Sequence, residues 1–427
     1  MGDLTTQFLP GLKAHRLEDL SLGEEFIYPK YDGGSILNLP STICHILGVP
    51  PLKSASLADE ILSVIGQARR VVLVLIDALA LHRLQQWSID GTAPRWARWI
   101  QEGFLIPLTS IVPSTTSAAL TSLWTGVSTA LHGVAGYELW LKEYSVIANM
   151  ITHAPMSFAS DNGSLVKAGF NTDTFLQPHT MLGTHLQKYG VKSYAFQPRH
   201  ITRTGLSHML FKDVEVESFN SPVELWINLR LAMESRPKER SYTWIYWGDI
   251  DNLSHFYGPD DDRPAAEFAA FTDAFERHFY NRLDRAARRD TLVLFTADHG
   301  SLTTPKYSHN ELSNHPALTN CLQMAPSGEG RLSYLYLRSG KEAAVREYIA
   351  RAWPGQYTLL NPEDVVRKGL FGSDGRHPRL MERLGDLIAI PQGKTYWWWP
   401  EKENRLLGRH GGLHAEEMLV PLMGIRL

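Results

Sequence analysis

The stretch Arg70–Leu79 (RVVLVLIDAL) decides the fold. Residues 71–76 are all aliphatic, and a short continuous run of this kind is typical of a strand that is buried on both faces of a parallel sheet. Asp77 follows the run directly, at the point where the strand is expected to end. The stretch therefore predicts a central strand with a carboxylate at its carboxyl end.

Similar apolar runs recur along the chain, and segments with helical patterns, such as residues 264–289, lie between them. The runs are Gly190–Phe196, Tyr242–Trp247, Asp290–Thr296 and Leu387–Ile390. Strands that alternate with helices indicate an α/β fold with a mostly parallel central sheet flanked by helices.

Composition shifts predict how the chain is divided. We expect residues 1–65 to form an N-terminal extension packed on the core, and residues 66–315 and 386–427 to form the catalytic core. Residues 136–185 are polar and contain Gly, Asn and Met, which suits a lid insertion. Residues 316–385 contain a predicted strand, a helix and a Gly-rich return, which is typical of a small inserted α/β subdomain.

The overall composition limits the classes of partner. The net charge is −3 and the pI is about 6.6, so we expect no nucleic-acid polymer as partner. The two cysteines, Cys44 and Cys321, do not indicate a disulfide framework. No apolar run is long enough to span a bilayer, and the N-terminus lacks the pattern of a signal peptide, so we expect a cytoplasmic protein without membrane contact. The oligomeric state stays open.

Acidic residues follow three of the predicted strands. Asp77 ends the first, Asp249 and Asp251 follow Tyr242–Trp247, and Asp298 follows Asp290–Thr296. Functional residues in such sheets cluster at the carboxyl ends of strands, so these carboxylates are expected to meet at one edge. Taken alone, each has an ordinary alternative; Asp77, for example, would also suit a helix cap.

Histidines stand beside these carboxylates in the sequence. His255 lies four residues after Asp251, so both would share one helix face. His299 follows Asp298, and the C-terminal Gly-rich segment carries His410 and His414, either of which would suit a ligand. Carboxylate and imidazole ligands suit Zn²⁺, with Mn²⁺ as the alternative.

A hydroxyl-rich run, Pro113–Ser117 (PSTTS), precedes an Ala-rich helical pattern that ends near Gly126. A hydroxyl at a helix N-terminus faces the positive end of the helix dipole, which favours an attacking alkoxide and an anionic phosphate. The alternative is a simple Ser/Thr helix cap. Together with the acids and histidines, the hydroxyl completes what two divalent metal ions need for hydrolysis at phosphorus.

These motifs, in this order, resemble the alkaline phosphatase superfamily, and within it the type I phosphodiesterase/nucleotide pyrophosphatase family. The resemblance runs from Asp77 to His410. It implies an alkaline-phosphatase-like core and a nucleophilic Thr three residues after a Pro and ten before the Gly of a Thr-Gly pair, which is Thr116. It also implies two metal sites, one held by Asp251, His255 and His410, and the other by Asp77, Thr116, Asp298 and His299. His414 falls on a non-ligand position.

The resemblance further implies a small phosphorylated substrate and a phospho-threonine intermediate. It departs at one position: relatives carry an Asn that helps hold a phosphate oxygen three residues after the nucleophile, where this chain has Ala119. That contact is then expected from the Thr116 amide or from Asn149. A phosphomonoesterase or phosphonate hydrolase is the alternative activity, with Lys142 as a candidate extra cation, and a non-catalytic binding protein is the alternative class. Trp397–Trp399 is expected to be a packed patch or a substrate platform.

Overall fold

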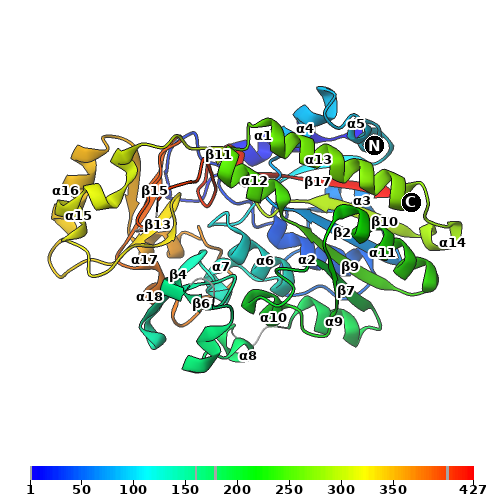
Figure 1. Ribbon diagram of the computed structural model, residues 1–427, viewed down its shortest axis with the longest axis horizontal. Helices are drawn as coiled ribbons and strands as arrows, with labels where there is room; N and C mark the ends of the chain where they lie inside the picture. The colour runs from blue at the N-terminus through cyan, green and yellow to red at the C-terminus, as the bar shows by residue number, and fades with distance from the viewer. Residues whose placement is uncertain (1, 159–160, 177–179, 401–402) are drawn as a thin grey trace.

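The computed structural model describes residues 2–158, 161–176, 180–400 and 403–427. Two β-sheets with helices around them make up this part of the chain (Figure 1). The larger sheet has eight strands in the order β1-β3-β17-β10-β2-β9-β7-β8. Their bounds in that order are Gly2–Asp3, Phe104–Thr109, Leu419–Arg426, Thr291–Thr296, Arg70–Ile76, Ser241–Trp247, Lys192–Pro198 and Glu215–Phe219.

The larger sheet is mostly parallel, as predicted. Every neighbouring pair is parallel except those of β17, which runs antiparallel to both β3 and β10. Strands β2 and β10 are buried at every position, because helices cover both faces of the sheet. Such strands favour apolar side chains, which explains their aliphatic runs. The α/β fold class is thereby confirmed.

The register of three central strands positions the acidic residues. Ile76, at the end of β2, pairs with Trp247 of β9, and Leu75 pairs with Thr296 of β10. The three strands therefore end at the same level. The residues that follow them reach one edge of the sheet.

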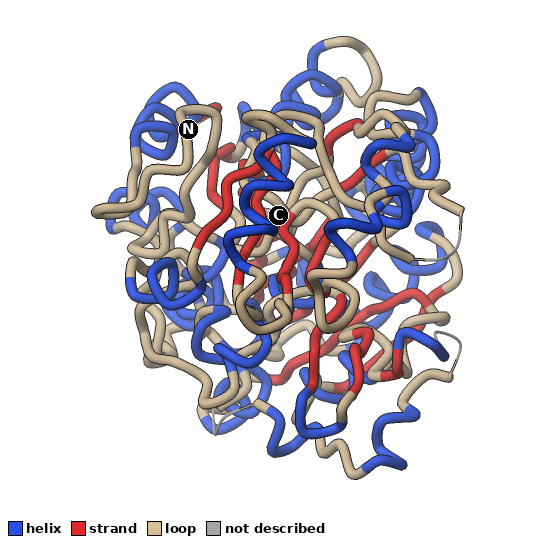
Figure 2. The backbone as a smooth tube through the Cα atoms, turned by 90° about the vertical axis from the view of Figure 1, so that its left-hand side faces the viewer, coloured by secondary structure: helices blue, strands red, loops and turns tan. Residues whose placement is uncertain are grey.

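Helices lie on both sides of the larger sheet, with α12 (Asp249–Tyr257) and α13 (Asp262–Phe275) on one side and α2 (Leu39–Ile46) and α6 (Thr116–Thr125) on the other (Figure 1). Figure 2 shows the strands inside and the helices around them. The helix predicted over 264–289 is interrupted: α13 ends at Phe275, a π-helical turn covers Glu276–Tyr280, and α14 follows at Arg285–Arg288.

Aromatic packing supports that interrupted segment. Phe271 of α13 stacks on Trp247 of β9 at 3.9 Å between ring centroids.

The other helices are α1 (Thr5–Ala14), α3 (Asp59–Ile65), α4 (Leu81–Ile89), α5 (Arg95–Glu102), α7 (Thr129–His132), α8 (Thr172–Phe175), α9 (Leu182–Lys188), α10 (Gly205–Leu210), α11 (Pro222–Ser235), α15 (Pro316–Thr319), α16 (Glu342–Ala352), α17 (Pro362–Arg367), α18 (Leu380–Leu384) and α19 (Ala415–Met418).

The second sheet joins two segments that are far apart in the sequence. Its order is β14-β15-β13-β12-β4-β5-β6, with bounds Tyr357–Leu360, Leu387–Pro391, Leu332–Leu335, Ser327–Glu329, Glu138–Leu141, Val146–Asn149 and Ala154–Pro155. Strand β12 pairs with β4 through Gly328 and Glu138. Strands from the predicted lid and from the predicted subdomain therefore form one sheet. A separate two-stranded ribbon pairs β11 (Leu302–Thr303) with β16 (Gly408–Arg409).

One strand lies elsewhere than predicted. We expected Leu387–Ile390 to belong to the core, together with the rest of residues 386–427, but this run forms β15 and pairs with β13 and β14 of the second sheet. An aliphatic run of this length predicts a buried strand without saying which sheet buries it, and that explains the error.

The N-terminal segment contacts the larger sheet. Strand β1 extends the sheet edge by pairing with β3, and Ile36 and Leu39 are fully buried in the main hydrophobic core. Among the described residues, no helix combines the length and the apolar character that crossing a membrane requires.

Candidate active site

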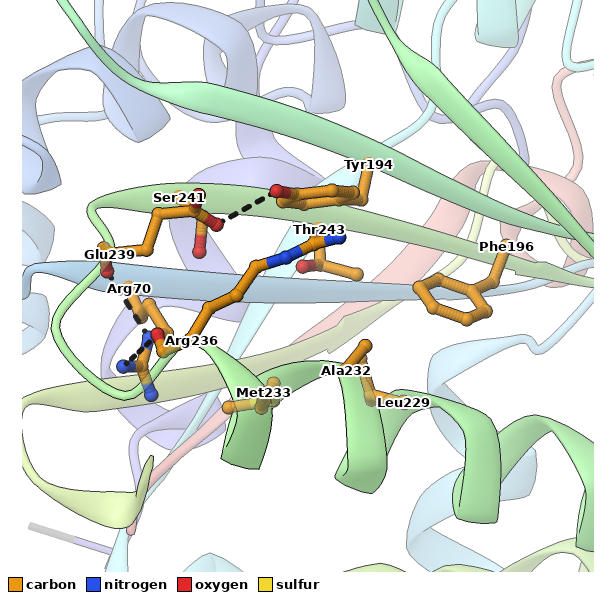
Figure 3. Close-up of a pocket in the computed structure, with 10 residues that line it drawn as sticks. All are labelled: Arg70, Tyr194, Phe196, Leu229, Ala232, Met233, Arg236, Glu239, Ser241 and Thr243. Atoms are coloured by element: carbon orange, nitrogen blue, oxygen red, sulfur yellow. Dashed lines mark hydrogen bonds between the residues drawn. The ribbon is translucent and has the colours of Figure 1, made fainter. Parts of the chain in front are cut away.

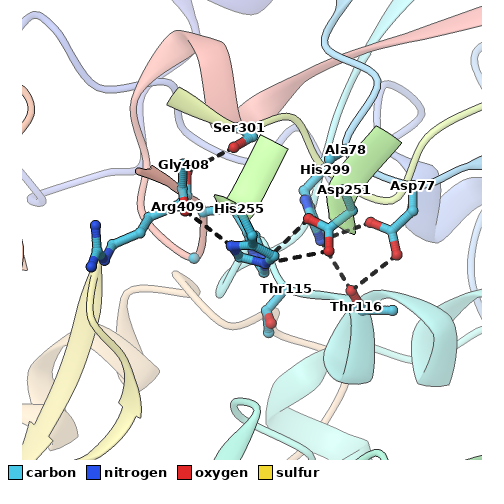
Figure 4. A network of polar contacts seen from close by, with 12 residues as sticks. Asp77, Ala78, Thr115, Thr116, Asp251, His255, His299, Ser301, Gly408 and Arg409 are labelled. Atoms are coloured by element: carbon cyan, nitrogen blue, oxygen red, sulfur yellow. Dashed lines mark hydrogen bonds and ion pairs between the residues drawn. The ribbon is translucent and has the colours of Figure 1, made fainter. Parts of the chain in front are cut away.

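Three aspartates, Asp77, Asp251 and Asp298, meet at the carboxyl edge of the larger sheet, and Figure 4 shows the first two. Asp77 follows β2, Asp298 follows β10, and Asp251 lies in the first turn of α12, just after β9. Asp77 and Asp298 are buried, and Asp251 is mostly covered. The predicted convergence of strand ends is therefore present in the structure.

Three histidine rings surround these carboxylates, and backbone carbonyls hold each ring in the same way. The Nδ1 atoms of His255, His299 and His410 lie 2.9, 3.0 and 3.1 Å from the carbonyl oxygens of Gly408, Gly300 and Ser114, respectively. Since a carbonyl oxygen only accepts, Nδ1 carries the hydrogen in each ring. This assigned tautomer leaves the lone pair of Nε2 available as a ligand.

The three Nε2 atoms point at the aspartates. His255 Nε2 lies 3.3 Å from Asp251 Oδ2, and His410 Nε2 lies 3.7 Å from Asp251 Oδ1. His299 Nε2 lies 3.4 Å from Asp77 Oδ1 and equally far from Asp298 Oδ2. The spacing of Asp251 and His255 by four residues places both on one face of α12, as predicted.

Each of the three aspartates has an oxygen with no hydrogen-bond partner in the described part of the chain: Asp77 Oδ1, Asp251 Oδ1 and Asp298 Oδ2. Burial, and then the neighbouring carboxylates, raise the pKa of Asp77, and burial raises the pKa of Asp298. For Asp251, the effect of burial is outweighed by His255 and His410, which hold its pKa below the usual value. Unpaired buried oxygens so close together are costly unless a cation joins them.

The donor set fits divalent metal ions. Two groups of ligand atoms lie within 4.8 Å of one another: Asp77, Asp298 and His299 form one, and Asp251, His299 and His410 form the other. The first group matches three of the predicted ligands of one metal. In the second, His299 takes the place that we expected for His255, whose Nε2 nevertheless faces Asp251.

Thr116 is the first residue of α6, and its side chain faces the aspartate–histidine cluster (Figure 4). Its Oγ1 lies 3.2 Å from His299 Nε2 and 3.4 Å from Asp77 Oδ2. The N-terminus of this ten-residue helix presents backbone N–H groups to the same place. The hydroxyl therefore lies between the aspartate–histidine cluster and the helix N-terminus.

The alternative of helix capping does not describe these residues. Thr115 occupies the N-cap position of α6, but its side chain makes no capping hydrogen bond and donates instead to Glu329 Oε1 at 2.6 Å. Asp77 does not cap the next helix, because α4 begins at Leu81 with Ala80 as its N-cap. His414, in contrast, accepts from the Glu416 N–H as the cap of α19.

Two further residues that the sequence offered for the site, Asn149 and Lys142, do not line the cavity, and Ala119 does not line it either. Ala119 is fully buried in the hydrophobic core, so a polar side chain there would not face the site. Asn149 does not line the cavity beside Thr116, and its amide oxygen accepts from the backbone N–H groups of Ile151 and Thr152. Lys142 pairs with Glu382 at the surface and is not a lining residue either.

A cavity of about 460 Å³ opens beside Thr116. Its walls come from both sheets, because Asp77, Tyr246 and Asp251 line one part, whereas Tyr137, Glu329 and Trp398 line another. Trp397 is buried against Tyr357, with ring centroids 4.2 Å apart, whereas Trp398 and Trp399 are partly exposed at the cavity. All three tryptophans line the cavity, and Trp397 is in addition packed against the second sheet.

Sequence reasoning missed Tyr137, Tyr246 and Glu329. Tyr246 donates its hydroxyl to Asp77 Oδ2, and its position in an apolar strand gave no signal of this. Glu329 reaches the site from β12, more than 200 positions after Thr116, so only the pairing of strands brings it there. Of the three, Tyr137 alone had a signal, since it lies shortly after the nucleophile in the predicted lid.

A second, much smaller cavity lies at the opposite end of β2, around Arg70 (Figure 3). It measures about 20 Å³, which leaves room for roughly one water molecule. Arg70 donates there to backbone carbonyls that include those of Glu239 and Ala287, and Tyr194 donates to Glu239. These contacts stabilise the amino end of the sheet and suggest no chemistry.

The sequence and the structure both match known proteins. Residues 71–413 match the sequence model of the type I phosphodiesterase/nucleotide pyrophosphatase family. No curated protein matches the chain.

Two solved structures illustrate the similarity of fold. The structure resembles murine ectonucleotide pyrophosphatase/phosphodiesterase 5, with a TM-score of 0.60 and 16% identity over 83% of this chain and 87% of that one. It resembles phosphonoacetate hydrolase from Sinorhizobium meliloti 1021 with the same TM-score and identity, over 84% and 90%. Because the family match covers most of the chain, including every predicted ligand, the protein belongs to the type I phosphodiesterase/nucleotide pyrophosphatase family.

Proposed function

We propose that this member of a family of metal-dependent phosphoester hydrolases cleaves small phosphodiesters or phosphoanhydrides through a phospho-threonine intermediate on Thr116. The observation that carries the proposal is the position of Thr116 Oγ1, which lies within 3.4 Å of both Asp77 and His299 at a helix N-terminus. A hydroxyl that faces a cation site and helix N–H groups is suited to attack an anionic phosphorus centre.

Two divalent cations, which we propose to be Zn²⁺, would be held by Asp77, Thr116, Asp251, Asp298 and the three histidines His255, His299 and His410. When bound, they would neutralise the phosphate oxygens and favour the ionised form of the Thr116 hydroxyl. The unpaired oxygens of the aspartates and the free Nε2 atoms of the histidines support this assignment. Mixed carboxylate and imidazole ligands favour Zn²⁺, with Mn²⁺ as the alternative.

The chain's own groups account for the two chemical steps. Thr116 Oγ1 loses its proton and forms a bond to phosphorus, while the bond from phosphorus to the leaving oxygen breaks and that oxygen takes up a proton. Water then forms a bond to phosphorus, the bond from phosphorus to Thr116 Oγ1 breaks, Oγ1 takes up a proton, and the phosphate product leaves. The N-terminal amides of α6 are placed to stabilise the negative charge of both transition states.

The charges around the cavity favour a diester over a monoester. A monoester dianion usually needs an extra cation, and Arg409 is the only Lys or Arg that lines the cavity within the described ranges. Its guanidinium lies 3.6 Å from the ring centre of Tyr396 and donates to Asn404 and Thr304, so it is already engaged. Glu138 lines the same cavity, and its carboxylate would repel a second negative charge, whereas burial raises the pKa of Glu329 to about 8.

Hydrolysis of bis-p-nitrophenyl phosphate and of p-nitrophenyl phosphate by the Zn²⁺- and Mn²⁺-loaded protein tests the proposal. We expect faster hydrolysis of the diester, and we expect Thr116→Ala to lower kcat by at least about 10³-fold while bound metal remains. Faster hydrolysis of the monoester would assign the alternative activity. Full activity of the Thr116→Ala variant would rule out the threonine nucleophile.

A further inference from the structure

Several polar side chains other than the proposed metal ligands line the cavity and differ in whether they have a hydrogen to offer to a bound phosphate. Most polar groups on its walls already use their hydrogens: Thr115 donates to Glu329 at 2.6 Å, and Tyr246 donates to Asp77. Ala119 faces the core, and Asn149 lies outside the cavity lining. The remaining hydroxyl on the walls is that of Tyr137.

The orientation of the neighbouring Asn149 shows whether the Tyr137 hydroxyl donates or accepts the hydrogen bond between them. Asn149 Oδ1 accepts from the backbone N–H groups of Ile151 and Thr152, at 2.8 and 3.0 Å. These two donors fix the amide, so its Nδ2 faces the Tyr137 hydroxyl oxygen, 2.6 Å away. Because Nδ2 can only donate, the tyrosine oxygen accepts this bond.

The proton of the Tyr137 hydroxyl consequently has no acceptor in the part of the protein that is described. Tyr137 lines the same cavity as Thr116, and 37% of its surface is exposed. Burial of the hydroxyl, and then Glu138 and Glu329, raise its pKa to about 12, so it keeps the proton at neutral pH. A hydroxyl that accepts from Asn149 and lines the cavity has a hydrogen to offer to a bound molecule.

The backbone of Tyr137 is tied to the residues that flank the site. Its N–H donates to Glu329 Oε1 at 2.9 Å, and the same oxygen accepts from Thr115, the residue before the nucleophile. The stem of Glu329 lies against Gly411, the residue after His410, where an added Cβ would meet the Cβ of Glu329 at 2.6 Å. Glu329 thus connects Tyr137 to the nucleophile helix and to a ligand loop.

We propose that the Tyr137 hydroxyl donates a hydrogen bond to a non-bridging oxygen of the phosphoryl group that Thr116 attacks. This role rests on the proposed function and deepens it. Negative charge in phosphoryl transfer is spread over the non-bridging oxygens, so a donor held in place before the reaction stabilises the transition state. Asn149 orients the hydroxyl, and Glu329 acts as a positioning residue.

Tyr137→Phe is the variant that tests the role, because it removes one oxygen and keeps the ring and the backbone bond to Glu329. We expect kcat/KM for bis-p-nitrophenyl phosphate to fall about 10²- to 10³-fold, with metal content and melting temperature unchanged. Tyr144→Phe is the matched control, since that hydroxyl donates to the Gly169 carbonyl at 3.3 Å and does not line the cavity. It should keep wild-type activity.

A phosphorothioate diester separates hydrogen bonding from structural support. Sulfur in place of a non-bridging oxygen is a poor acceptor, so the wild-type protein should lose rate with this substrate, whereas Tyr137→Phe should lose markedly less. Wild-type kcat/KM in Tyr137→Phe, or equal sulfur effects in both proteins, would overturn the role of Tyr137 alone. A wild-type protein inactive on every phosphoester would instead refute the proposed function.

Discussion

At the scale of single residues, backbone contacts determine which histidines can act as ligands. His410 is held through Nδ1 by the Ser114 carbonyl, so its Nε2 faces Asp251. His414 lies only four positions later, but its Nδ1 accepts from the Glu416 N–H at 3.3 Å. The same side-chain type therefore turns Nε2 toward an aspartate in one case and caps a helix in the other.

Replacing these two histidines separates the roles. We expect His410→Ala to lower the bound metal measured by inductively coupled plasma spectrometry, and to lower activity with it, because Asp251 loses a partner at the site. His414→Ala should keep its metal and lose about 1 kcal/mol of unfolding free energy, as removal of a cap does. Metal loss in His414→Ala but not in His410→Ala would reverse the ligand assignment.

At the scale of elements, helix α6 presents its N-terminus to the site and its apolar side chains to the core. Thr116 lies in its first turn, facing Asp77 and His299, whereas Ala119 is fully buried three residues later. The Ser122 hydroxyl on the same helix lies 3.1 Å from His132 Nε2, so a hydrogen bond joins α6 to the following helix α7. Position 119 therefore faces the core, because the helix turns successive side chains to different sides.

Ala119→Asn tests this orientation. Inserting a buried amide should lower the unfolding free energy by about 2–4 kcal/mol through overpacking and an unpaired polar group, without improving KM for the diester. Leu231→Asn on the exposed face of α11 is the matched control and should cost about 0.5 kcal/mol in chemical denaturation. A lower KM in Ala119→Asn with unchanged stability would show that this position faces the phosphate.

At the scale of the whole molecule, a buried ion pair joins the second sheet to the loop that carries His410. Arg331 lies between β12 and β13 and is fully buried with Glu417, 2.8 Å from guanidinium to carboxylate. Glu417 also accepts from the N–H groups of Gly412 and His414. The Arg331–Glu417 ion pair therefore connects the second sheet to helix α19 and, through these N–H groups, to the loop after His410.

Removing one partner of this pair should be costly. We expect Arg331→Met to lower the unfolding free energy by about 3–5 kcal/mol, because Glu417 stays buried without its cation, and to weaken metal binding through the His410 loop. Arg405→Ala breaks an exposed pair with Glu403 and should leave the melting temperature unchanged. Equal melting temperatures for wild type and Arg331→Met would show that the pair does not stabilise the loop.

The sequence by itself determined the α/β class, the strands that end at Asp77, Asp251 and Asp298, and the segment that holds Thr116. Local patterns suffice for these features, because a buried parallel strand requires an aliphatic run and its polar residues follow at the carboxyl end. The same local reasoning placed Leu387–Ile390 in the wrong sheet and offered Asn149 for a phosphate contact, although Asn149 does not line the cavity, since long-range packing is not encoded in a short pattern.

Only the tertiary structure decided what completes the cavity. Tyr137 and Glu329 come together because β4 and β12 pair in the second sheet, although they are almost 200 residues apart in the sequence. The hydrogen bond from Asn149 then determines that the Tyr137 hydroxyl accepts there, while bonds from the Tyr137 N–H and from Thr115 to Glu329 hold the backbone beside it. Such long-range contacts depend on the packing of the whole chain, so no single stretch of the sequence predicts them.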